Sequence, residues 1–109
     1  MILITKEIQQ AFEKQGYTGN KKPEDIRIVC KLFNPVGAQT WYLYEQEDED
    51  IYMAFVNLGE PMFAECGRVS LNELKSLRLP LGLGIERDRH FGSHTLKEVM
   101  DTVKSGGHV

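Results

Sequence analysis

Four strand-like runs with short connections are the feature that most limits what this chain can fold into. They cover residues 26–33, 39–44, 51–58 and 62–69. The first run alternates apolar and polar residues, which is typical of a strand with one buried face, whereas the third run is apolar at both odd and even positions. Connections this short cannot carry a chain across to a parallel neighbour. The runs therefore predict an antiparallel meander of about four strands, with the third strand central or covered on both faces.

Three helices are predicted around this sheet. Thr5 can cap a first helix over residues 6–15. Two later segments match the capping box, in which a hydroxyl binds the amide of the third helical residue and a Glu at that position binds back. These pairs are Ser70 with Glu73 and Thr95 with Glu98, and Pro80 and Gly106 are expected to end the two helices. The fold class is therefore α+β, with helices at the N-terminus, after the sheet and at the C-terminus, and the last three residues are expected to fray.

Composition favours a single globular domain over residues 1–109. The chain is 41% apolar and 27% charged, and its formal charge of −3 argues against a general electrostatic grip on nucleic acid. We expect neither a secretory signal nor a membrane span, because no apolar run is long enough. Cys30 and Cys66 lie in strand-like runs and are expected to be buried, reduced thiols, which indicates a cytoplasmic protein.

An acidic run and an aromatic group are the candidate partner-binding features. Five carboxylates lie between two apolar runs, where they predict a solvated hairpin tip that solubilises the protein or docks a basic partner. Most of the neighbouring aromatic residues fit core packing, and an exposed subset could stack on a ligand or line an interface. The candidate residues are Glu45, Glu47, Asp48, Glu49 and Asp50 with Trp41 and Tyr44.

The segment between the last two helices, residues 79–91, combines glycines with consecutive charged residues and forms either a connection or a short edge strand. If it is extended, Glu86, Asp88 and His90 point to one side, and Arg87 to the other. Two carboxylates and an imidazole could hold a divalent metal or act as acid and base, although exposed ion pairs are the more common use of such residues. No complete nucleotide-binding motif is present, so we expect no cofactor and assign no metal site.

Several of these blocks resemble one known family. They are LITKE at 3–7, KLFNP at 31–35, TWY at 40–42, the acidic run, VSLNEL at 69–74, and LGLGIERD at 81–88 followed by Phe91. In these blocks the chain is similar, nearly end to end, to domain of unknown function 2958 (DUF2958), a bacterial family found on plasmids and other mobile elements. The resemblance implies no activity or catalytic residue. It marks 81–88 as the family's hallmark. Since His is not typical of the family at the position of His90, the resemblance leaves Glu86, Arg87 and Asp88 as the better candidates for functional-site residues.

Two functions are expected from these features. The first is a non-enzymatic accessory protein that binds another macromolecule, most simply a protein, through the acidic tip and exposed aromatics; a homodimer is left open. The alternative is a metal-dependent enzyme or small-ligand binder whose site centres on Glu86, Asp88 and His90. Nucleic-acid binding through exposed arginines fits the negative charge poorly.

Overall fold

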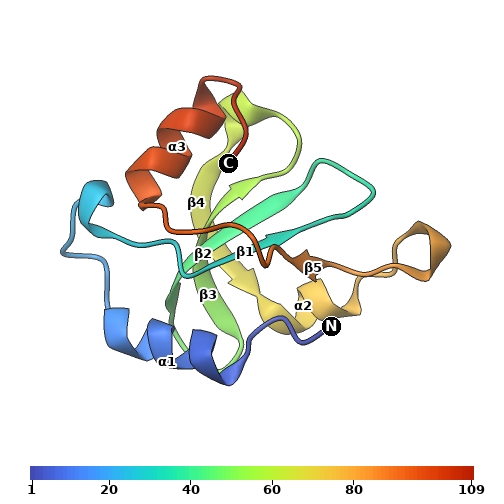
Figure 1. Ribbon diagram of the computed structural model, residues 1–109, viewed down its shortest axis with the longest axis horizontal. Helices are drawn as coiled ribbons and strands as arrows, with labels where there is room; N and C mark the ends of the chain where they lie inside the picture. Colours follow the sequence, from blue (N-terminus) through green and yellow to red (C-terminus); the bar gives the residue numbers. More distant parts are fainter.

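The computed structural model describes residues 1–109 as an α+β fold built on a five-stranded antiparallel sheet (Figure 1). The strands are β1 (Cys30–Phe33), β2 (Thr40–Gln46), β3 (Ile51–Asn57), β4 (Glu65–Ser70) and β5 (Glu86–Arg87). Their order across the sheet is β4-β3-β2-β1-β5, so β4 and β5 are the two edges. The predicted meander is confirmed, and its third strand is an interior strand. The segment between the last two helices adds β5 as a fifth, edge strand.

The three predicted helices are α1 (Lys6–Gln15), α2 (Leu71–Ser76) and α3 (Leu96–Lys104). The hydroxyls of Thr5, Ser70 and Thr95 cap these helices, accepting from the N–H groups of Ile8, Glu73 and Glu98 at 3.1–3.2 Å. The return bond of the two predicted capping boxes is absent, because neither Glu73 nor Glu98 accepts from the N–H of its capping residue. α2 ends before Pro80, because Leu77 already has an extended backbone. Three short 3₁₀ turns, Pro23–Asp25, Pro61–Phe63 and Pro80–Gly82, each begin with proline. None of the helices combines the length and hydrophobicity needed to cross a membrane.

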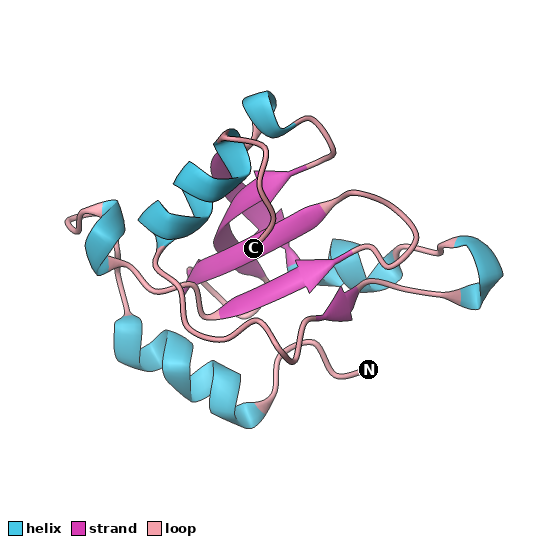
Figure 2. Cartoon of the chain, turned by 45° about the horizontal axis from the view of Figure 1, so that its top comes forward, coloured by secondary structure: helices cyan, strands magenta, loops and turns pink.

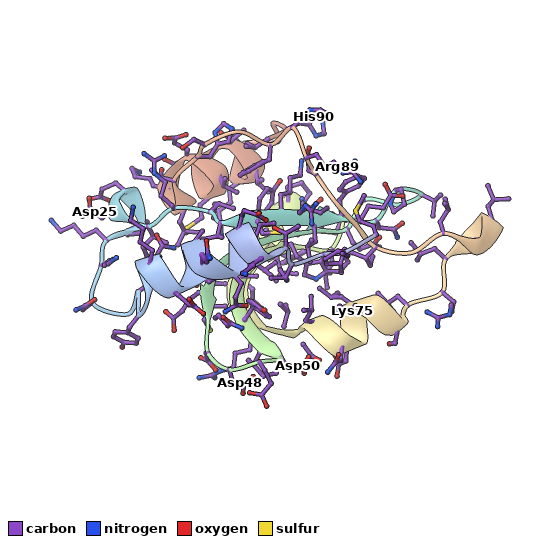
Figure 3. The ribbon with its side chains drawn as sticks, turned by 60° about the horizontal axis from the view of Figure 1, so that its bottom comes forward. Asp25, Asp48, Asp50, Lys75, Arg89 and His90 are labelled. Carbon is purple, nitrogen blue, oxygen red and sulfur yellow. The ribbon has the colours of Figure 1, made fainter.

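The sheet has a hydrophobic core on each face. On the first face, the N-terminal segment, α1 and α2 cover Leu32, Leu43 and Tyr52. On the second face, α3 covers Tyr42 and Phe55. Figures 2 and 3 show α2 and α3 on opposite sides of the sheet. The sheet is therefore the middle of three layers, and β2, buried on both faces over most of its length, is its centre.

The first strand is shorter than predicted because a side chain replaces a strand partner. The amide of Gln15 accepts from the Arg27 N–H at 2.9 Å and donates to the carbonyls of Arg27 (2.8 Å) and Tyr44 (2.6 Å). Arg27 also forms an isolated bridge with Thr95. These contacts satisfy the backbone around Arg27 without strand pairing, so β1 begins only at Cys30.

Two further expectations are wrong. Cys30 is a buried free thiol, but Cys66 is exposed, because β4 is an edge strand that no helix covers at this point. The last residues do not fray: the main-chain oxygen of Val109 is bound by Lys31 and Tyr42. Both differences depend on which segments pack over the sheet, a question that local sequence patterns do not answer.

Candidate functional site

The acidic run does not form one exposed patch, and its first residue points inward. Glu45 follows Tyr44, which is the unpaired residue of a bulge in β2. The Glu45 carboxylate is buried and accepts two hydrogen bonds from Thr18, from its N–H at 2.8 Å and from its hydroxyl at 2.6 Å. Glu45 therefore anchors the loop after α1 to the sheet and lies away from the hairpin tip.

Asp48 and Asp50 are used by the backbone around them. Asp48 accepts from the N–H groups of Asp50 and Ile51 at 2.8 and 2.7 Å, which shapes the β2–β3 turn. Asp50 accepts from the Ser70 hydroxyl at 2.6 Å and from the Asn72 N–H at 2.7 Å. These two bonds, Ser70 first, hold the pKa of Asp50 below its ordinary value. Asp50 therefore ties the acidic turn to the start of α2.

Glu47 and Glu49 are the remaining members of the run. Both oxygens of Glu47 accept from the Arg68 guanidinium Nε, at 3.0 and 2.9 Å. Glu49 is exposed, and no hydrogen bond or ion pair engages its side chain. A single unbound carboxylate remains at the tip, so the run offers much less free charge than its sequence indicates.

The predicted aromatic residues Trp41 and Tyr44 lie in the core, on opposite faces of the sheet. Burial, together with the neighbouring Cys66, raises the pKa of Tyr44. Trp41 keeps only 7% of its surface exposed. The two rings therefore form no common stacking surface, although the exposed edge of Trp41 lines an apolar groove.

The block 86–88 closes the β5 edge of the sheet. β5 pairs antiparallel with β1, and the Arg87 guanidinium donates to the carbonyl of Ile2 and, at 3.0 Å, to that of Leu3. Asp88 forms an ion pair with Lys31 at 3.4 Å. Arg87 and Asp88 therefore tie β5 to the N-terminal segment and to β1, whereas no hydrogen bond or ion pair engages the Glu86 side chain.

Glu86, Asp88 and His90 do not converge on one point. No three His, Cys, Asp or Glu side chains lie close enough together to hold a metal ion. Asp88 is engaged by Lys31 and accepts from the backbone N–H of His90 at 2.8 Å. Arg89 and His90 lie on the opposite side of the molecule from the acidic tip (Figure 3).

The loop before β5 projects from the body of the molecule (Figures 1 and 2). At its tip, Leu81 is 92% exposed and has a positive φ of 65°, followed by Gly82 with φ of 72°. A left-handed conformation at a leucine is uncommon and strained, whereas glycine adopts it freely.

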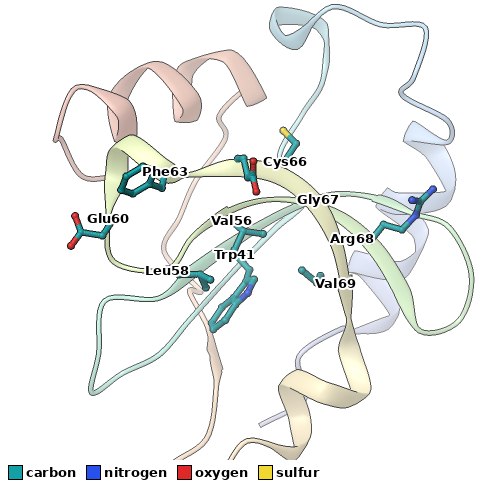
Figure 4. A pocket seen from close by; sticks show the side chains of 10 residues that line it. Trp41, Val56, Leu58, Glu60, Phe63, Cys66, Gly67, Arg68 and Val69 are labelled. Atoms are coloured by element: carbon teal, nitrogen blue, oxygen red, sulfur yellow. The ribbon is translucent and has the colours of Figure 1, made fainter.

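An apolar groove that no local sequence pattern predicts lies on the first face of the sheet. It has a volume of about 550 Å³ and lies between the ends of β2, β3 and β4, on the part of the face that α1 and α2 leave open. Its apolar walls come from Trp41, Val56, Leu58, Phe63 and Val69. Figure 4 shows Trp41, Leu58 and Val69 on one side of β4, with Cys66 pointing to the other. We call this site the β4 groove.

Three polar features accompany the β4 groove. Glu60 and Glu65 lie on its rim, and neither carboxylate has a hydrogen-bond or ion-pair partner. The Trp41 indole N–H binds no protein acceptor, and because no fully buried side-chain N or O atom is left unpaired, this N–H is in contact with solvent. A Cβ added at Gly67 would meet nothing within 4 Å. The groove is therefore apolar and has room above Gly67, and its edge carries two unpaired carboxylates together with Arg68, which is paired with Glu47.

Comparison with known proteins places the chain in a family. The family model described as "Protein of unknown function (DUF2958)" matches residues 3–109, nearly the whole chain. The chain belongs to this family. No curated protein and no solved structure matches this DUF2958 protein. The family description assigns no activity to its members.

Proposed function

We propose that this DUF2958 protein is a non-enzymatic interaction module that binds an extended segment of a protein partner in the β4 groove. The observation that carries the proposal is an apolar groove at an open sheet edge, with an unpaired indole N–H from Trp41 in its wall. Phe63, at 74% exposure, extends the apolar surface at the rim. An exposed apolar surface with polar residues at its rim is typical of protein-interaction sites.

The charges on the rim indicate which segment fits. Glu60 and Glu65 would pair with a Lys or Arg of the partner, and the apolar walls would take its aliphatic or aromatic side chains. The Trp41 N–H would donate to a carbonyl of the partner backbone. The outer edge of β4 pairs with no strand, so the same segment could add hydrogen bonds along it. The expected ligand is therefore an extended, apolar peptide with a basic residue.

The alternative function, an enzyme or metal-dependent binder around Glu86, Asp88 and His90, stays a prediction that no contact in the structure favours. The free thiols Cys30 and Cys66 fit a reducing compartment, in which a cytoplasmic partner would be met. Of the residues expected to bind a partner, Trp41 keeps that role in this proposal.

The proposal is tested by filling the groove without disturbing the fold. Gly67→Leu adds a side chain into open space at a strand position with ordinary φ, so we expect the protein to fold and the groove to be occupied. Gly84→Leu is the matched control, because a Cβ at Gly84 also meets nothing within 4 Å but lies outside the groove. Short random peptides displayed on phage would be selected on the wild-type protein.

The expected result is a selected set rich in apolar residues with a Lys or Arg. Binding should weaken about tenfold or more in Gly67→Leu, about 1.4 kcal/mol, and stay unchanged in Gly84→Leu. Reversing the rim charge with Glu65→Lys should weaken binding and reduce its dependence on salt. Peptides that bind Gly67→Leu as tightly as the wild type would show that the groove is not the binding site.

A further inference from the structure

The projecting loop, residues 77–85, carries an apolar surface that its own chain leaves uncovered (Figures 1 and 2). Leu81, at its tip, is 92% exposed, and Leu77, at its base, is 42% exposed. The backbone at Leu81 also has a φ of 65°, which leucine rarely adopts. Because this strained side chain contributes little packing to its own fold, we look for its use in a contact with another molecule.

The projecting loop is held in one shape by its own backbone. The N–H of Leu79 donates to the carbonyl of Leu83 at 3.0 Å, and the N–H of Leu83 donates to the carbonyl of Pro80 at 3.3 Å. Leu79 packs against the core on the first face, which fixes the base of the turn. Leu81 is therefore presented on a closed turn, so a contact through this side chain needs little further ordering of the chain.

The loop and its base carry only positive charge. Residues 74–85 contain two charged side chains, Lys75 and Arg78. Neither forms an ion pair. The Arg78 guanidinium donates to the carbonyls of Lys75 and Ser76, at 3.3 and 3.2 Å, and Lys75 is exposed. Two positive charges without a carboxylate partner thus accompany the apolar tip.

The β4 groove has the complementary properties. Its walls are apolar, its volume is about 550 Å³, and the carboxylates of Glu60 and Glu65 on its rim are unpaired. The third charged side chain at the rim, Arg68, is already paired with Glu47 at 2.9 Å. No residue of the projecting loop lines the groove of its own chain. One molecule therefore offers a basic apolar projection and, at a separate place, an acidic apolar groove.

We propose that the projecting loop of one molecule docks in the β4 groove of a second copy, with Leu81 between the apolar walls. Lys75 and Arg78 then lie toward the two rim carboxylates, and opposite charges favour this orientation. The proposal, which rests on the proposed function of the groove, names the partner as the protein itself. The loop has the expected composition, apolar with a basic residue, but it enters as a closed turn and leaves the backbone edge of β4 unpaired.

The two surfaces differ, so each molecule brings one loop and one groove. Two molecules that exchange loops form a closed pair, whereas docking in one direction forms a chain of molecules. One loop in one groove is a small interface, and small interfaces bind weakly. We therefore expect association that increases with protein concentration.

The first measurement is the molar mass of the full chain by analytical ultracentrifugation over a range of concentrations. The wild type should rise above the monomer mass. Leu81→Gly removes the side chain at a backbone conformation that glycine adopts freely, so it should fold and associate at least tenfold more weakly. Gly67→Leu, which fills the groove, should have the same effect. Val36→Ala shortens an exposed aliphatic side chain outside the loop and the groove, and this matched control should associate like the wild type.

A mixture of the two weakened variants tests whether loop and groove bind each other. Gly67→Leu keeps its loop and Leu81→Gly keeps its groove, so together they should form a one-to-one pair. Trp41 is the single tryptophan, and its indole N–H therefore gives one NMR signal. In isotope-labelled Leu81→Gly this signal should shift when unlabelled Gly67→Leu is added, and stay in place when unlabelled Leu81→Gly is added. Arg78→Gln, introduced into the Gly67→Leu partner, should weaken the pair and reduce its dependence on salt.

Three results would overturn the proposal. They are a wild type that stays monomeric with an unshifted indole signal, association that survives Leu81→Gly, and association that survives Gly67→Leu. Leu81→Asn, which also tolerates a left-handed backbone, provides the same comparison if Leu81→Gly does not fold.

The same variants separate this proposal from the proposed function. If the wild type stays monomeric but selected peptides bind it and not Gly67→Leu, the groove remains a peptide-binding site and only the second copy is wrong as its partner. If peptides bind Gly67→Leu as tightly as the wild type, and the mixed variants form no pair, both proposals are wrong.

Discussion

One edge of the sheet is covered by other segments of the chain, and the other edge is open. At the β5 edge, Arg87 binds the N-terminal segment, Asp88 binds Lys31, and the tail packs nearby. At the β4 edge no strand, helix or tail is added, and an apolar groove remains open beside it. The block that stands out in the sequence, 81–88, thus builds the closed edge, whereas the surface best suited to a partner lies at the other edge.

The difference has a physical basis. An unpaired strand edge invites association with other chains, and proteins protect it with charged side chains or by covering it. β5 and the N-terminal segment cover β1. β4 is protected only by exposed charged side chains such as Glu65 and Arg68, which leave its backbone accessible. An open edge of this kind is tolerated in a folded protein and remains available for a specific partner.

The largest expected contrast between the edges is in thiol reactivity. Cys30 lies on β1 beside the closed edge, and burial raises its pKa to about 12. Very little of the Cys30 thiol is therefore ionised at pH 8, and the thiolate is the reactive form. Cys66, on β4, is exposed. We expect a chromogenic disulfide reagent to modify one thiol per folded chain quickly and the second only after denaturation.

The variant Cys66→Ser identifies the fast thiol. In that protein the fast phase should vanish while the slow thiol remains. A fast reaction in Cys66→Ser would mean that β1 opens readily and that the β5 edge of the sheet is not closed.

The second contrast is in the free energy of unfolding. Ile85, just before β5, is buried in the core on the first face, whereas Leu58, at the β4 groove, is 64% exposed. Ile85→Ala should cost about 3 kcal/mol, because it removes buried methyl groups and leaves a cavity. Leu58→Ala should stay within about 0.5 kcal/mol of the wild type. Urea denaturation of both variants measures the difference, and equal costs would remove the distinction between a packed and an open edge.

The third contrast compares Arg87 with Arg89, two residues further along the closed edge. Arg87 donates to the carbonyls of Ile2 and Leu3, whereas Arg89 is exposed, with no hydrogen bond or ion pair from its side chain. Arg87→Ala should lower the free energy of unfolding by about 2 kcal/mol, because it leaves these carbonyls without their charged donor. Arg89→Ala should change it by less than about 0.5 kcal/mol. Hydrogen exchange should also quicken in residues 1–5 of Arg87→Ala, and unchanged exchange there would show that Arg87 does not hold this segment.

The parts of the fold that depend on residues close together in the sequence could be predicted. The meander follows from alternation and short connections, and the caps at Ser70 and Thr95 follow from a Glu three residues later. The pairing of β5 was less accessible, because a two-residue strand has no period to recognise. Its presence between two capped helices was the only available signal.

The features that depend on which segments pack over the sheet could not be predicted from the sequence. Glu45 belongs to an acidic run, but a bulge at Tyr44 and the return of the chain at Thr18 bury it. Cys66 has a strand-like context, yet the strand lies at an edge. The β4 groove exists because α1 and α2 cover only part of one face of the sheet. In each case the deciding neighbour is distant in the sequence, so local patterns carry no information about it.

The smallest expected contrast concerns Asp50, which binds Ser70 at the C-terminal end of β4. Its pKa in the folded protein is lowered from 3.8, first by the Ser70 hydroxyl and then by the Asn72 N–H. The stability that Asp50 contributes is therefore fully present above the unfolded pKa and is lost as the pH falls through the folded pKa. Asp50→Asn should be less stable than the wild type at neutral pH, and the difference should narrow below about pH 4. Glu49→Gln, which removes the adjacent carboxylate without a partner, should show no such pH dependence in urea denaturation between pH 2 and pH 7. A difference that stays constant down to the lowest pH would mean that the Asp50 charge does not hold this end of β4, so the open edge would depend on packing alone.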